Sequence, residues 1–103
     1  MKGKDLLEYQ RQRRKHQSDL FRKAFDYRRD DLFQLCPPPW VLDQDNSKGV
    51  CVKDNIGQIV FFDDFSEPPP EIPAYIVGDA ILRSRMLAHF LVEFSESQLE
   101  EMR

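Results

Sequence analysis

Hydrophobic and polar positions follow different patterns in the two parts of the chain. Residues 1–35 contain no proline and a single glycine, and they are rich in residues that favour helices. Apolar residues recur at helical spacing near both ends of this segment, but none occurs in residues 10–19. The pattern predicts a long N-terminal helix whose core-facing stripe begins at Leu20. Its polar middle is expected to be solvated, frayed or held against a partner.

Three consecutive prolines, Pro37 to Pro39, end this helix, because each lacks an amide hydrogen and forces the preceding residue toward extended backbone. Short apolar runs then alternate with turn sequences that contain Asn and Gly; the runs are 40–42, 50–52 and 59–62. β-Branched and aromatic residues suit strands, and Asn and Gly can take the positive φ angles of tight turns. This part of the chain predicts a three-stranded antiparallel β-meander.

A second proline-rich stretch, residues 63–73, holds four prolines among acidic residues and predicts an exposed, extended loop. Pro73 suits the first turn of a helix that runs to about Phe94 and is apolar nearly all round, so this helix belongs in the core or in an interface. Ser95, followed by Gln98, resembles a capping box and predicts a separate short acidic helix. The expected fold class is α+β, with the apolar C-terminal helix packed on the sheet.

Composition and charge narrow the class of protein. The 103 residues carry a formal net charge of −3, with +4 on residues 1–35 and −7 on residues 36–103. We therefore divide the chain into a basic helical arm, 1–35, and a small acidic α+β body, 36–103, which carries the exposed loop 63–73. The length excludes a multidomain enzyme. The lack of an apolar leader or of a run of about 20 apolar residues predicts a cytoplasmic protein without a membrane span.

Candidate catalytic and metal-binding groups are few. His16, Cys36, Cys51 and His89 lie 20, 15 and 38 residues apart along the chain, whereas structural zinc sites pair ligands about two to five residues apart. Cys51 falls where a small buried apolar residue is expected, and both cysteines are predicted to be inert. The acidic residues of the loop 63–73 are expected to be solvating charges rather than a general acid and base. We expect neither enzyme activity nor a cofactor or metal.

The basic arm is the strongest electrostatic feature of the sequence. An ordinary solvated helix face would explain it, but the arm could also lie in the groove of an acidic protein or contact nucleic-acid phosphates. The acidic balance of the whole chain and the lack of a recognised nucleic-acid-binding motif favour the protein partner. The predicted partner contacts are Arg11, Arg13, Arg14, Lys15, Arg22, Arg28 and Arg29.

The two proline runs are most simply stiff connectors, although polyproline II segments are also ligands for aromatic grooves. Exposed X-Pro bonds isomerise slowly and are natural targets of a peptidyl-prolyl isomerase. If the second run has this function, the contact is predicted at Glu67, Pro68 and Pro69. Self-association is a further possibility, because the apolar C-terminal helix offers more surface than three strands cover.

A basic N-terminal helix, a small acidic body and an exposed Glu-Pro-Pro-Pro-Glu loop at residues 67–71, in about one hundred residues, resemble the anti-RecBCD proteins of lambdoid bacteriophages, in particular the second of the two. The resemblance lies in length and layout. It implies a phage protein that binds the host RecBCD helicase-nuclease in the bacterial cytoplasm, mainly through RecC, and redirects it from DNA degradation toward recombination. It also implies capture of a host prolyl isomerase, which maps onto Pro68.

The assignment of the arm to the RecBCD contact comes from its charge and exposure and not from the resemblance. DNA mimicry is a competing mechanism, in which loop and tail carboxylates imitate phosphates. Interleaved prolines and the positive arm argue against it. A small nucleic-acid-associated protein, with the arm on phosphates, is the alternative function.

Overall fold

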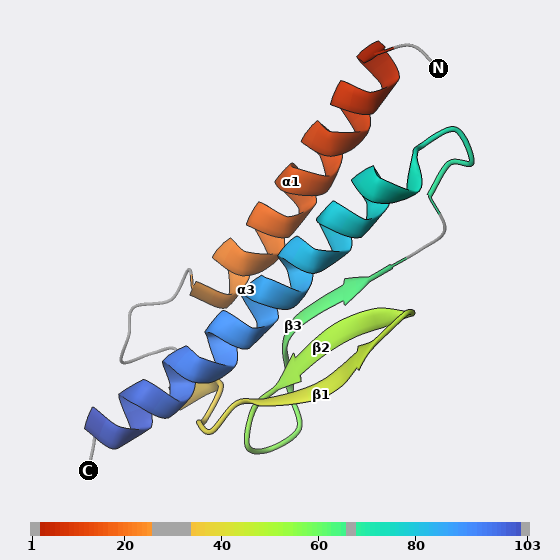
Figure 1. Cartoon of the computed structure of the whole chain (residues 1–103). Helices are drawn as coiled ribbons and strands as arrows, with labels where there is room; N and C mark the ends of the chain where they lie inside the picture. The colour runs from red at the N-terminus through yellow and green to blue at the C-terminus, as the bar shows by residue number, and fades with distance from the viewer. Residues whose placement is uncertain (1–2, 26–33, 66–67, 102–103) are drawn as a thin grey trace.

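The computed structural model describes residues 3–25, 34–65 and 68–101. Its elements follow in the order α1 (Gly3–Phe25), β1 (Val41–Asn46), β2 (Gly49–Lys53), β3 (Ile59–Asp64) and α3 (Ala74–Glu101). The strands form one antiparallel sheet in the order β1-β2-β3, which confirms the predicted α+β meander. Figure 1 shows α1 and α3 side by side on one face of this sheet. None of the described helices combines the length and apolar character needed to cross a membrane.

The core lies between the sheet and the two helices. Val52 of β2 pairs directly with Phe61 of β3, so both side chains point to the same face of the sheet, and both are buried. Cys51 pairs with Phe62, so both side chains point to the face of the sheet opposite to the helices (Figure 1). The remaining buried members of the core are Ala24, Trp40, Val50, Ala88 and Leu91.

The two turns of the meander use glycine for different reasons. Gly57, between β2 and β3, is the one described residue with a positive φ, 88°, a backbone conformation that glycine adopts without steric cost. Gly49 lies in β2 opposite Asn46, and a Cβ there would be 2.8 Å from the backbone oxygen of Asp63. The predicted positive φ is therefore confirmed at Gly57 and wrong for the first turn, where glycine permits close approach of β3.

Helix α3 is continuous from Ala74 to Glu101, so the predicted break at Ser95 is wrong. The Ser95 hydroxyl donates to the carbonyl oxygen of Val92 at 2.8 Å and accepts from the backbone N–H of Trp40 at 3.0 Å. A hydroxyl that is occupied in this way within a helix does not cap a new one. Ser95 instead fixes Trp40 beneath the C-terminal half of α3.

The predicted exposed loop 63–73 begins later than expected. Asp63 and Asp64 are the last residues of β3, because Asp63 pairs with Val50 in the ladder, and Asp63 is completely buried. The prediction that its carboxylate is a solvating charge is therefore wrong. Pro69, Pro70 and Glu71 are exposed, as the loop prediction requires.

Candidate functional site

An ion pair between Arg13 of α1 and Asp63 of β3 lies at the junction of the helices and the sheet. The Arg13 Nη2 atom donates to Asp63 Oδ2 at 2.7 Å. The Asp63 side chain is fully buried, and only 20% of the Arg13 side chain is exposed. A buried carboxylate needs such a partner, because an uncompensated charge in the core is strongly unfavourable. This pair therefore helps to attach α1 to the sheet.

Two neutral side chains extend the network to α3. Ser84 donates to the same Oδ2 atom of Asp63, and Gln17 donates to the hydroxyl oxygen of Ser84 at 2.9 Å. Gln17 also donates to the carbonyl oxygen of Ala80 at 2.6 Å. Gln17 and Ser84 are both buried, so their hydrogen bonds offset the cost of removing polar groups from water. The network joins α1, β3 and α3 at one point.

The second carboxylate oxygen of Asp63 is less well satisfied. Its Oδ1 atom is buried and accepts no hydrogen bond from a described residue. The Nε2 atom of His16 lies 3.4 Å from it, and the His16 side chain is half exposed. Arg13 and Ser84 both donate to Oδ2 and hold the carboxylate inside the protein. The arrangement serves packing better than acid–base chemistry.

Helix α1 places this network through its spacing. Arg13, Gln17 and Ala24 are four and seven residues apart, which puts them on one helical face, and all three face the protein interior. The prediction that the run from Arg11 to Gln17 is solvated, frayed or held against a partner is therefore wrong for Arg13 and Gln17, which pack inside the protein. The signal that could have found them is their register with Leu20 and Ala24 in the apolar stripe.

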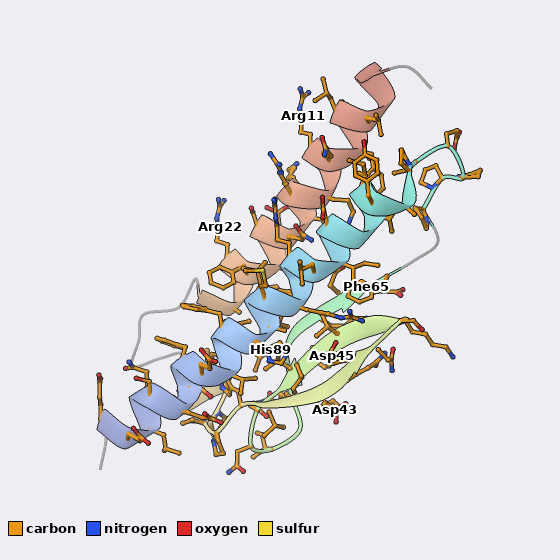
Figure 2. The ribbon with its side chains drawn as sticks, viewed as in Figure 1. Arg11, Arg22, Asp43, Asp45, Phe65 and His89 are labelled. Carbon is orange, nitrogen blue, oxygen red and sulfur yellow. The ribbon has the colours of Figure 1, made fainter. Side chains whose placement is uncertain are left out.

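Three of the seven predicted partner contacts form an exposed basic face. Arg11, Lys15 and Arg22 repeat the four- and seven-residue spacing, shifted by two positions, and all three are exposed; we call them the outer row. Figure 2 shows Arg11 and Arg22 projecting from α1 on the side away from the sheet. Lys15 and Arg22 have no ion-pair partner among the described residues, and Arg11 makes only an exposed pair with Glu8, at 3.7 Å.

The remaining predicted partner contacts divide into three cases. Arg14 is exposed beside the outer row. Arg13 is occupied by the internal pair with Asp63. Arg28 and Arg29 lie outside the described residues.

A groove of about 530 Å³ lies between α1 and α3, and Arg22 of the outer row lines it. Half-buried Phe21 and Leu87 line it together with the exposed arginines Arg14, Arg22 and Arg83. No Asp or Glu of the described chain lines this groove. The groove therefore combines an apolar surface with uncompensated positive charge.

A second set of charges links α3 to the edge strand β1. Arg85 Nε lies 2.8 Å from Asp45 Oδ1, and His89 Nε2 lies 3.5 Å from Asp45 Oδ2. Figure 2 shows His89 and Asp45 between α3 and β1. The Arg85 guanidinium also lies over the Phe65 ring, 5.9 Å from its centroid. These side chains are partly exposed and hold the helix over the sheet edge.

The residues considered as metal ligands do not converge. His16 lies beside Asp63 and His89 beside Asp45, and within the described ranges no three His, Cys, Asp or Glu side chains are placed to hold a metal ion. Both cysteines are free thiols, and Cys51 is buried, as predicted.

Both thiols are poor nucleophiles. Burial raises the pKa of the Cys36 and Cys51 thiols. The charge of Asp54 adds to the rise in pKa at Cys36; at Cys51, Asp43 adds to it and Lys53 opposes it. A raised pKa keeps a thiol protonated at neutral pH, and a protonated thiol is a weak nucleophile and ligand.

The predicted prolyl-isomerase contact is only partly described. Glu67 lies outside the described residues. Pro68 is half-buried and Pro69 is exposed, and both line a second groove of about 390 Å³ with Tyr9 and Phe65. Pro69 is thus more accessible than Pro68.

Comparison with protein-family models, with curated proteins and with solved structures finds no match for this chain.

Proposed function

We propose that this protein is a non-enzymatic modulator that binds host RecBCD, through RecC, in the bacterial cytoplasm. The observation that carries the proposal is the outer row of α1, Arg11, Lys15 and Arg22, which is exposed while the opposite face of the same helix is packed against the protein. Exposed cations without internal partners suit an acidic protein surface. The resemblance in length and layout to anti-RecBCD proteins names the partner.

Binding alone is sufficient for the proposed effect. A protein that binds one working state of a large enzyme more tightly than another shifts the enzyme toward that state. Such a mechanism requires a stable binding surface but no catalytic group. The buried network around Asp63 supports it, because it fixes α1 against the sheet and so presents the outer row in one orientation.

The experiment measures binding of the purified protein to purified RecBCD by biolayer interferometry. Charge reversal of the outer row, Arg11→Glu with Lys15→Glu and Arg22→Glu, is expected to weaken binding at least about tenfold, since like charges would then face each other. Lys48→Glu, an exposed change in the β1–β2 turn, is the control for a single charge reversal outside the outer row and should leave binding unchanged. An outer-row variant that binds as tightly as the unmodified chain would contradict the proposal.

The alternative function is nucleic-acid binding through the same outer row. It predicts that the protein binds duplex or single-stranded DNA with an affinity that falls steeply as salt is added. The logarithm of the binding constant should fall against the logarithm of the salt concentration with a slope of about −0.7 to −0.9 for each phosphate neutralised. If DNA binds in this way and RecBCD does not, the alternative replaces the first proposal.

Capture of a prolyl isomerase is proposed at the loop that contains Pro68 and Pro69. The exposed ring of Pro69 supports access to this segment. Pro68→Ala is expected to abolish binding of a purified bacterial prolyl isomerase, whereas Pro37→Ala, at the other proline run, should retain it. Equal retention by both variants would exclude the loop as the contact.

A further inference from the structure

An apolar ridge runs along the solvent-facing side of α3. Leu82, Met86 and Phe90 are four residues apart, so they lie on successive turns of one helix face. They are 55%, 63% and 51% exposed, respectively. Large apolar side chains that are grouped and exposed in this way mark interaction surfaces more often than isolated ones do. The apolar pattern of α3 predicts more apolar surface than the sheet covers, and the ridge is exposed surface of this kind.

The ridge is continuous with the groove between α1 and α3. Arg83 and Leu87, which line the groove, each follow a ridge residue in the sequence. The Phe90 ring of the ridge packs against the Phe21 ring of the groove, with centroids 5.8 Å apart. We call the ridge and the groove together the ridge–groove surface.

Charge complementarity indicates what this surface binds. Arg14, Arg22 and Arg83 are exposed along the groove, and none of them pairs with a described residue. Arginine, methionine and phenylalanine are the residue types enriched in protein–protein interfaces. Ridge residues four apart also match the grooves of a second helix, which are formed by rows with the same spacing.

We propose that the ridge–groove surface binds an amphipathic helix of a partner protein, with the apolar side of that helix on the ridge and its acidic side on the three arginines. The identity of the partner rests on the proposed function, because the ridge–groove surface is where RecC would bind. A second copy of this chain fits less well, because a symmetric pair would bring the same arginines of both copies together. Nucleic acid fits less well, because its phosphates gain nothing from an apolar ridge.

The test introduces a charge on the ridge. Met86→Glu is expected to weaken RecBCD binding at least about tenfold, because a carboxylate is buried against apolar groups and faces acidic ones. The side chain is 63% exposed, so the variant should fold, which circular dichroism checks. Ile56→Glu is the matched control: Ile56 is 67% exposed in the β2–β3 turn, outside the ridge–groove surface, and its replacement should leave binding unchanged.

A defined peptide separates this inference from the proposed function. The probe is a synthetic fluorescent 18-residue helix with leucines four apart and glutamates on both flanks, measured by fluorescence anisotropy. The inference predicts that the unmodified protein binds this peptide, that Met86→Glu and Arg83→Glu lose this binding, and that Ile56→Glu keeps it. This result supports the inference even where RecBCD does not bind. A peptide with lysine in place of glutamate should not bind.

Three results would overturn the inference. If RecBCD binds and Met86→Glu binds it equally well, the proposed function stands and the ridge–groove surface is excluded. If the unmodified protein sediments as a dimer that Met86→Glu dissociates, or binds single-stranded DNA rather than the acidic peptide, the surface has a different occupant.

Discussion

The inner and outer rows of α1 have the same spacing and opposite surroundings. Arg13, Gln17 and Ala24 form the inner row, and Arg11, Lys15 and Arg22 form the outer row, so each outer residue precedes an inner residue by two positions. Two residues correspond to a rotation of about 200° around a helix. The inner row is packed against β3 and α3, and the outer row is exposed. Position around the helix, more than local charge density, therefore decides which cations can reach a partner.

The largest difference in stability between the two rows is expected between variants of Arg13 and variants of Arg11. Arg13→Met leaves the buried Asp63 carboxylate without its cation and is expected to lower the free energy of unfolding by about 3–5 kcal/mol. Arg11→Met should change it by less than about 0.5 kcal/mol, because this side chain is exposed. Urea unfolding followed by fluorescence of Trp40, the single tryptophan, measures both. Equal losses in the two variants would show that the inner row does not differ from the outer row.

Ser95 and Ser97 extend the comparison to α3. Ser95→Ala removes the acceptor of the buried backbone N–H of Trp40. This change is expected to lower the free energy of unfolding by about 1–3 kcal/mol. Ser97 is exposed, and Ser97→Ala should change stability by less than about 0.5 kcal/mol. Thermal unfolding by circular dichroism compares the pair. A Ser95→Ala protein as stable as the unmodified chain would mean that another group satisfies Trp40.

Gly49 and Gly78 should respond to alanine with opposite signs. A Cβ at Gly49 would meet the Asp63 backbone oxygen at 2.8 Å, so Gly49→Ala is expected to destabilise the protein by about 1–3 kcal/mol. Gly78 lies inside α3 with open space around it, and Gly78→Ala should stabilise the helix by about 0.5–1 kcal/mol. The urea midpoints of the two variants should therefore move in opposite directions. A shift in the same direction would argue against the close approach at Gly49.

The smallest effect is expected at the exposed ion pair of Arg11 and Glu8. Both side chains are more than half exposed, so Glu8→Gln should change the unfolding free energy by no more than about 0.5 kcal/mol. The remaining difference should vanish in 1 M NaCl, where the screening length falls to about 3 Å. A loss as large as that in Arg13→Met would remove the distinction between exposed and buried pairs.

Local sequence patterns predicted the elements well where neighbouring residues decide the structure. The meander between residues 41 and 64 and the helix after Pro73 were expected from apolar runs, turn residues and prolines, and the structure confirms them. The prediction at Ser95 was wrong because a capping pattern is local, whereas the partner of that hydroxyl is Trp40, 55 residues away.

The candidate site was harder to predict than the fold. Basic composition directed attention to α1, but it grouped Arg13 with exposed arginines and treated Asp63 as a loop charge. Whether a charged side chain is buried depends on the partner that meets it. Arg13 and Asp63 are 50 residues apart, and Gln17 and Ser84 are 67 apart. The apolar ridge on α3 was foreseen as excess apolar surface, although its continuity with the arginine groove was not.

Local sequence is enough to specify the order and type of the elements, the basic character of α1 and the apolar character of α3, because these depend on backbone preferences and on periodicity along a few residues. The tertiary structure alone decided which polar groups are internal. Burying Asp63 is possible only where Arg13 and Ser84 arrive together from two different helices. The same packing leaves the outer row and the ridge–groove surface facing solvent.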